Sequence, residues 1–350
     1  MNLYRLGKLP GFDAMTVFHA MAYLGVEGLV FVSPSDPIVT LGYFQDAKTG
    51  VDLDYCQRAN LGVMRREVGG GTTLLDSNQI FFQIILHKDN EIARGDALDL
   101  YRKFSEPVIK AYGDLGVKVR FKEVNDLITV EGNKKITGEG GANIGESKVF
   151  VGGILLDFDT ETMSKVFPVP NEEYRQQILQ TLENNVTSLK KELGQIPSRE
   201  FVENRLIHHF SELFGPLEEG SLNTEVLNKA RELEKLYTSE EFISRKRKEN
   251  TSIKIASGIH VYENRYKAVG GTIHSIIELK EKKLGKVNLY GDFTFLPKEK
   301  VRDLEEALVD VEMEKEQIKQ VITLFIQKEK IDTPGVTPED FATAIVGTNI

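Results

Sequence analysis

The pattern of apolar residues changes twice along the chain, and these changes limit the folds open to it. Strand-like runs alternate with helices up to about residue 158. From Asn171 to about Lys248 the residues are rich in Glu, Lys, Gln and Leu, which predicts helices. Strand signals return near Asn250. Because 350 residues exceed what one hydrophobic core usually covers, we expect two domains.

The predicted fold is α+β: a mixed β-sheet flanked by helices over residues 1–249, helical from about residue 171, and a small α/β domain over 250–350. Asp52, Ser198 and Thr337 are the expected helix N-caps. In the first domain we expect helices over 14–24, 52–60 and 95–115 and strands over 28–32, 37–41, 62–66, 80–87, 117–121, 127–130 and 149–158. In the second we expect strands over 271–279 and 286–290 around a turn, then helices over 298–309, 314–328 and from Thr337 onward.

Composition narrows the choice of partners. The net charge of −9 argues against nucleic acid, because phosphate binding needs a basic face. The apolar runs are too short to span a bilayer and the N-terminus has no secretory pattern, so we expect a cytoplasmic protein without a membrane partner. The single cysteine, Cys56, cannot form an internal disulfide. His208 and His209 fall in a predicted helix, and we interpret them as structural or surface residues.

Residues 65–79 include three consecutive glycines, Gly69 to Gly71, after the pair Arg65-Arg66. Glycines in a row are unfavourable inside a regular element, so they indicate unusual dihedrals or close approach by another group. Their exposed N–H groups can form an anion site, and the arginines can grip phosphate or carboxylate. No Gly-Lys-Ser/Thr follows, so this is not a nucleotide P-loop. A wide turn with two solvated arginines remains an equal alternative.

Residues 125–145 hold five glycines around one lysine pair. The sequence Glu-Gly-Asn-Lys over 131–134 predicts a hairpin turn, with Lys135 opening the return strand. Strand alternation would then place Lys135 and Thr137 on one side and Ile136 on the other. A lysine there can neutralise phosphate or a polarised carbonyl, and Asp126 could orient it or bind Mg²⁺. By itself this segment also fits a charged surface hairpin.

Together the two segments resemble the lipoate–protein ligase family. That family has two arginines, two variable residues and a triple glycine, then Asp and an amide-bearing strand. About fifty residues later it has Asn-Asp and a hairpin with Lys-(Ile/Val)-x-Gly. The matching residues here are Arg65-Arg66, Gly69 to Gly71, Asp76, Asn78-Gln79, Asn125-Asp126 and Lys135 to Gly138. Residues 266–272 and 290–293 resemble the family's small accessory domain, so the resemblance covers nearly the whole chain.

The resemblance implies the biotin/lipoate ligase fold, with a catalytic domain and a fused accessory domain. It implies that ATP activates lipoate as lipoyl-AMP, and that the lipoyl group passes to a lysine of a lipoyl-carrier protein. Lys135 and Asp126 would be catalytic, with Asp126 also a candidate for Mg²⁺. The residues implied to contact ATP or lipoate are Arg66, Gly69, Gly70, Gly71, Thr72, Asp76, Asn78, Gln79, Asn125, Gly138 and Ala142.

Two positions depart from the family. Leu75 stands where the family commonly has His, and Gln79 stands where it usually has Asn. Both would lie in the wall around the acyl chain, so they leave the identity of the acid open.

Three other functions stay open. An octanoyl or lipoyl transferase of the same fold acts without ATP, either through a cysteine or with lysine as the acid/base. Cys56, however, lies upstream of the arginines in a predicted helix, where a buried structural role is expected. Biotin ligation would need a Gly-Arg-Gly-Arg type loop, which is absent. An inactive relative that binds lipoylated proteins is the non-enzymatic alternative.

Overall fold

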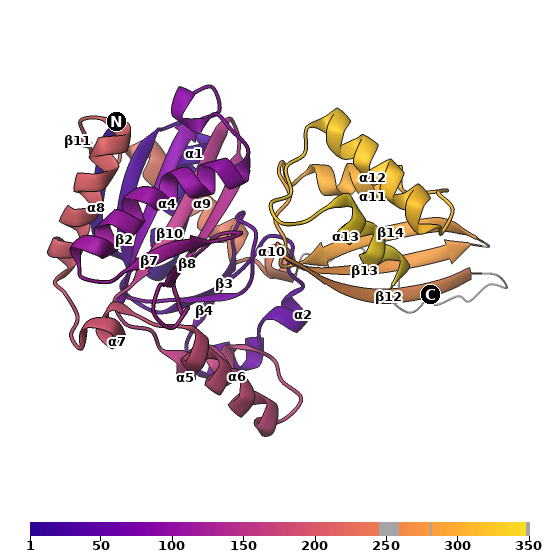
Figure 1. Cartoon of the computed structure of the whole chain (residues 1–350), viewed down its shortest axis with the longest axis horizontal. Helices are drawn as coiled ribbons and strands as arrows, with labels where there is room; N and C mark the ends of the chain where they lie inside the picture. Colours follow the sequence, from indigo (N-terminus) through magenta and orange to yellow (C-terminus); the bar gives the residue numbers. More distant parts are fainter. Residues whose placement is uncertain (245–258, 281, 348–350) are drawn as a thin grey trace. The chain divides into compact units, whose positions relative to one another are not determined.

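The computed structural model describes residues 1–244, 259–280 and 282–347, which form two compact units (Figure 1). The predicted boundary at residues 249 and 250 lies outside the described residues. The first unit comprises Met1–Leu41, Ala47–Glu67 and Thr72–Ser244. The second comprises Gly42–Asp46, Val68–Gly71 and Arg245–Ile350.

An eight-stranded mixed sheet forms the centre of the first unit, with the strand order β11-β1-β2-β6-β10-β9-β8-β7. Strand β1 runs parallel to β11 and β2, and the other neighbours pair antiparallel. The strands are β1 (Asn2–Leu9), β2 (Gly28–Pro34), β6 (Gln79–His87), β7 (Val119–Lys122), β8 (Asp126–Thr129), β9 (Lys135–Ile144), β10 (Ser147–Leu155) and β11 (Glu218–Glu219).

Helices cover both faces of this sheet, which explains why β6 is an almost continuous apolar run. The ring of Phe82 in β6 lies 5.7 Å, between centroids, from that of Phe210 in α8 (Arg199–Phe214). The next residue, Gln83, donates a hydrogen bond to the carbonyl of Ala14 in α1, on the opposite face. The longer helices are α1 (Gly11–Tyr23), α4 (Ala97–Asp114), α6 (Glu172–Asn185), α8 (Arg199–Phe214) and α9 (Thr224–Tyr237).

A second, three-stranded sheet lies in the same unit, with β3 between β4 and β5. Its apolar residues pack with Cys56 and Met163 from two short helices into a core of their own. Its strands are β3 (Ile38–Leu41), β4 (Gly62–Arg65) and β5 (Thr73–Leu75). The short helices are α2 (Ala47–Gly50), α3 (Leu53–Arg58), the 3₁₀ helix Glu91–Ala93, α5 (Thr160–Val166), α7 (Leu189–Leu193) and α10 (Glu240–Ser244).

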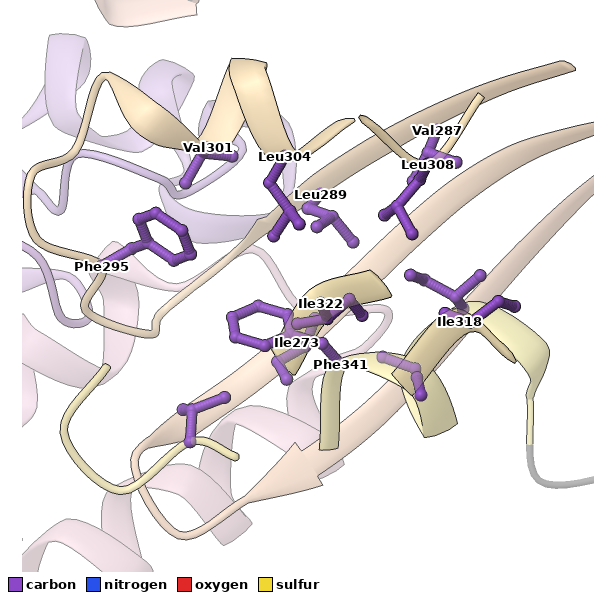
Figure 2. Packing of buried hydrophobic residues seen from close by; sticks show 14 of the residues in the cluster. Ile273, Val287, Leu289, Phe295, Val301, Leu304, Leu308, Ile318, Ile322 and Phe341 are labelled. Atoms are coloured by element: carbon purple, nitrogen blue, oxygen red, sulfur yellow. The ribbon is translucent and has the colours of Figure 1, made fainter. Parts of the chain in front are cut away.

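The second unit has an antiparallel three-stranded sheet covered by three helices. Figure 2 shows side chains from both layers, among them Ile273, Leu289, Leu304 and Phe341, gathered in one apolar interior. The strands are β12 (Ile259–Ala268), β13 (Gly271–Lys280) and β14 (Lys283–Gly291), and the helices are α11 (Lys300–Ala307), α12 (Lys315–Glu329) and α13 (Pro338–Val346).

The predicted class of each domain is confirmed, and so are the three predicted caps. Asp52 accepts a hydrogen bond from the N–H of Tyr55, Ser198 from that of Phe201, and Thr337 forms a full capping box. Strand β1 was not predicted, because its central residues Arg5 to Lys8 do not alternate cleanly and its register shifts at Gly7. No helix among the described residues is both long and apolar enough to cross a bilayer.

Candidate active site

Lys135 and Asp126, the two predicted catalytic residues, are brought together at the hairpin of β8 and β9. Lys135 Nζ lies 2.6 Å from Asp126 Oδ1. Their side chains are 42% and 31% exposed, so the pair is open to solute. Each residue is the first of its strand, which fixes the backbone beneath both side chains. The Lys135 ammonium is thus accessible to solvent and is oriented by one carboxylate, that of Asp126.

The predicted alternation along β9 is wrong, because a β-bulge interrupts it. Leu127 pairs with Thr137, but the next residue of β8 pairs with Lys135, so Ile136 is an extra residue. Thr137 is fully buried, and its hydroxyl lies 2.8 Å from that of Tyr112 in α4. The bulge therefore turns Thr137 toward α4, while the Lys135 amine reaches Asp126 on the other face.

Of the other predicted residues of this hairpin, Gly138 and Asn125 lie at the pair and Ala142 lies farther along β9. Gly138 pairs directly with Asp126, and a Cβ added at Gly138 would lie 3.0 Å from Lys135 Nζ. Asn125 holds the start of the hairpin: its carbonyl accepts from the N–H of Glu139 at 2.9 Å, and its side-chain amide donates to the carbonyl of Glu139. Ala142 is buried farther along β9, opposite Val149. Their predicted contacts with a nucleotide stay predictions.

The segment between α6 and α7 fixes Lys135 from a second direction. The N–H of Thr187 donates to the carbonyl of Lys135 at 2.8 Å, and Val186 forms a parallel bridge with Lys135. The backbone of this lysine is therefore held by its own hairpin and by a segment about fifty residues away. Such support leaves the side chain as the part that can respond to a ligand.

Glu139 is a titratable group near this pair that the sequence reasoning missed. Its side chain is buried, and its Oε2 accepts a 2.6 Å hydrogen bond from the hydroxyl of Ser105 in α4. Burial raises the pKa of Glu139 to about 8, and the negative charge of Asp126 adds to the effect. The sequence signal for a buried acid was a single Glu between two glycines, at residues 138–140. The side of β9 on which this Glu lies, however, depends on the bulge.

The two arginines before the glycines are both buried, not solvated. Arg65 is completely buried and donates through Nε to the carbonyls of Phe242 and Ile243, at 2.9 and 3.2 Å. Arg66 donates from Nη1 to the carbonyl and hydroxyl oxygens of Thr40, at 3.2 and 2.8 Å. Burial lowers the pKa of Arg66 to about 10, so it stays a cation at neutral pH. Its predicted anion contact stays a prediction.

The triple glycine belongs to the second unit, where a close contact accounts for Gly69 and a positive φ for Gly70, whereas a Cβ at Gly71 would meet nothing within 4 Å. A Cβ added at Gly69 would lie 2.8 Å from the hydroxyl oxygen of Thr294. Gly70 has a φ of +87°, and its carbonyl oxygen would lie 1.8 Å from a Cβ at Gly42. That these glycines line a ligand site with Lys135 stays a prediction.

The remaining predicted contacts lie in the first unit. Thr72 is buried and donates from its hydroxyl to the carbonyl of Gly50 at 2.8 Å. Asp76 accepts from the N–H of Asn78 at 2.8 Å and from the amide of Gln79 at 3.4 Å. Burial raises the pKa of Asp76. The structure thus brings Asp76, Asn78 and Gln79 into one polar cluster.

Cys56 is fully buried in α3 within the core of the small sheet. Burial, and next the negative charge of Asp52, raise the pKa of its thiol to about 11. A thiol is nucleophilic as the thiolate, so Cys56 is a poor candidate for covalent catalysis.

Two family models match the chain. The lipoyl protein ligase A/B catalytic domain matches residues 16–211, more than half of the chain. The bacterial lipoate protein ligase C-terminus matches residues 260–345. The first match falls mostly within the first unit, and the second spans most of the described sheet and helices of the second unit.

Three known proteins show what the chain is similar to. It is 30% identical over 217 residues to lipoate-protein ligase A subunit 1 from Thermoplasma acidophilum, covering 59% of this chain and 80% of that protein. It is 27% identical over 234 residues to the octanoyltransferase LipM from Kyrpidia tusciae, covering 60% and 84%. The crystal structure of lipoate-protein ligase A bound with ATP matches with a TM-score of 0.58 at 26% identity, covering 69% and 98%.

The Lys–Asp hairpin, the mixed sheet and the family models thus agree on one assignment. The chain belongs to the lipoyl protein ligase A/B catalytic domain family, and it carries a lipoate protein ligase C-terminal domain.

Proposed function

We propose that the chain is an ATP-dependent lipoate–protein ligase. In the first step the lipoate carboxylate attacks the α-phosphorus of ATP, and pyrophosphate leaves. In the second, the amine of a lysine on a lipoyl-carrier protein attacks the carbonyl of lipoyl-AMP, and AMP leaves. Both steps develop negative charge on oxygen, so the protein has mainly to position the reactants and stabilise that charge.

The Lys135–Asp126 pair supports this chemistry. A partly exposed ammonium can neutralise both the carboxylate and the α-phosphate as they approach each other. Asp126 orients it at 2.6 Å, and Thr187 and the hairpin hold its backbone. The bare backbone at Gly138 leaves room beside the amine, since any Cβ there would crowd it. During transfer the same amine can stabilise the oxyanion.

Mg²⁺ fits this site only together with the nucleotide. Asp126 offers one carboxylate, and Mg²⁺ in nucleotide sites is commonly held by one or two carboxylates, substrate phosphates and water. When bound, the ion would screen the phosphate charge. We propose that Asp126 contacts it while Lys135 moves toward the reacting carboxylate.

The burial and the thiol pKa of Cys56 distinguish a ligase from a cysteine-dependent transferase. The chain has one cysteine, and it is fully buried with a pKa of about 11. Octanoyl transfer through a thioester needs a reachable thiolate. A ligase needs no thiol, so this observation favours the ligase over a cysteine-dependent transferase.

A direct test incubates the protein with ATP, Mg²⁺, lipoate and a panel of carriers: lipoyl domains, the glycine-cleavage carrier and a carrier of sulfur metabolism. Mass spectrometry then reads the mass added to each carrier. We expect a lipoyl adduct on at least one carrier only when ATP is present, and lipoate-dependent ATP–pyrophosphate exchange without any carrier. Modification from octanoyl-carrier protein without ATP would instead support the transferase.

A further inference from the structure

Helix α8 carries two adjacent histidines and a glutamate whose side chains converge. Within the described part of the chain, His208, His209 and Glu212 form a group whose ligand atoms all lie within 4.8 Å of one another. His208 Nε2 lies 3.7 Å from Glu212 Oε1, and His209 Nδ1 lies 3.5 Å from Glu212 Oε2. Spacings of four and three residues place Glu212 one turn beyond both histidines.

The environment of His209 points to a missing ligand. Its side chain is only 10% exposed, and its buried Nδ1 makes no hydrogen bond, with the Glu212 carboxylate 3.5 Å away as an ion-pair contact only. A buried polar atom without a partner is costly, and native proteins rarely leave one. His208 and Glu212, with side chains 60% and 46% exposed, leave the outer side of the group open to water.

A carboxylate on the neighbouring helix prepares His209 for coordination. His209 Nε2 lies 2.9 Å from Oδ2 of Asp114, the last residue of α4. Donation of the Nε2 proton to this carboxylate leaves the lone pair on Nδ1, the atom that faces Glu212. Histidines that bind metals commonly donate their second ring N–H to a carboxylate in this way.

We propose that His208, His209 and Glu212 bind one divalent transition-metal ion of the Zn²⁺ type, with Asp114 as the outer partner of His209. Bonds of about 2.0–2.2 Å in a tetrahedron put ligand atoms roughly 3.4 Å apart. The separations of 3.7 and 3.5 Å, to the two oxygens of Glu212, are near this value, and the 4.8 Å limit for the whole group means that the side chains must rotate inward to close on the ion. Imidazole nitrogens with one carboxylate suit Zn²⁺, and water would complete the shell.

Lys110 of α4 competes with the ion. Its Nζ lies 3.0 Å from Glu212 Oε2 and 3.6 Å from Glu106 Oε1. A metal would replace this ammonium at Glu212 and release it to Glu106. The bound ion would connect α8 to the end of α4 through His209 and Asp114, so binding should raise the melting temperature of the chain.

The test titrates the untagged full-length chain with ZnCl₂ by calorimetry and follows melting with and without Zn²⁺. We expect one equivalent to bind and the melting temperature to rise. His208→Ala should weaken binding at least tenfold, and Asp114→Asn by about 10–100-fold. Lys110→Gln should instead tighten binding, by up to about fivefold, the strength of an exposed ion pair.

His87→Ala is the matched control, because His87 is a partly exposed histidine 3.5 Å from the carboxylate of Asp89, outside this group. It should leave Zn²⁺ binding unchanged. His208 is exposed, so His208→Ala should melt like the parent in the absence of metal. Binding that does not saturate at one equivalent, or that is equally strong in His208→Ala, would overturn the proposal. So would equal weakening by His87→Ala.

Discussion

The amine of Lys135 lies so close to Gly138 that even a methyl group at residue 138 would displace it. A Cβ at residue 138 would lie 3.0 Å from both Cε and Nζ of Lys135. Contacts this short force one of the two groups to move, and the end of a lysine is the more flexible one. The glycine of the Lys-Ile-Thr-Gly motif therefore sets the position of the lysine amine.

Gly138→Ala should displace the Lys135 amine without unfolding the chain. A shift of a few tenths of an ångström relieves this contact, and misplacement of a catalytic group by about 1 Å can cost about 10²-fold in rate, so we expect a smaller loss, up to about tenfold, in lipoate-dependent ATP–pyrophosphate exchange. Gly113→Ala in α4, where an added Cβ meets nothing within 4 Å, should keep full exchange. Unchanged exchange in Gly138→Ala would show that this contact is not important.

Lys135→Ala should fold normally, because an exposed ion pair contributes only about 0–1 kcal/mol to stability. Loss of a charge-stabilising group typically costs about 10²–10³-fold in rate. We expect such a loss in adenylate formation, in transfer from supplied lipoyl-AMP, or in both, measured separately. Lys134→Ala is the neighbouring control, since Lys134 Nζ lies 3.3 Å from the carbonyl of Glu183, away from Asp126. Equal turnover by Lys135→Ala and the parent would reject the proposed role of Lys135.

The hairpin that carries Lys135 and Asp126 was predictable because turn residues follow local rules. The bulge at Ile136 was not, since it arises from pairing with β8 and from packing of Thr137 against Tyr112. Local signals likewise gave the caps at Asp52 and Thr337.

The contacts of the two arginines could not be predicted from the sequence. A pair beside glycines indicates anion binding, yet Arg65 binds the carbonyls of Phe242 and Ile243, about 180 residues away. The assignment of Val68–Gly71 to the second unit also depends on residues such as Thr294, far along the chain. Contacts of this range leave no periodic signal in the sequence.

Gly42→Ala should disturb the triple glycine within the second unit. The new Cβ would lie 1.8 Å from the carbonyl oxygen of Gly70, so the backbone must shift. If the glycines line the nucleotide site, ATP affinity should fall at least about tenfold, comparable to the loss of one good contact. Equilibrium binding of ATP measures this, and circular dichroism checks the fold. Unchanged ATP affinity would argue against the glycine cradle.

Cys56→Ala should retain nearly all ligase activity. The thiol is fully buried and its pKa is about 11, so almost none is thiolate at neutral pH. Removing one buried sulfur should cost on the order of 1 kcal/mol of stability. Turnover within about twofold of the parent, with a slightly lower melting temperature, is the expected result. A loss above 10²-fold in a folded variant would point to a thioester mechanism.

Glu139 should make the stability of the chain depend on pH. Its pKa is about 8 when folded, against an ordinary value of 4.5, so the folded state holds a proton that the unfolded state releases between these values. Stability should therefore fall as pH rises from about 5 to 8 and level off above 8, by an amount on the order of a few kcal/mol. Urea unfolding across this range measures it.

Glu139→Gln keeps the size of the side chain but removes its titration. Its amide can replace the protonated carboxyl beside Ser105, so the variant should be about as stable as the parent near pH 5 and more stable near pH 8. The difference between the two proteins isolates the contribution of Glu139, because every other side chain remains in both. Parallel stability curves for parent and variant would mean that Glu139 is already ionised in the folded protein.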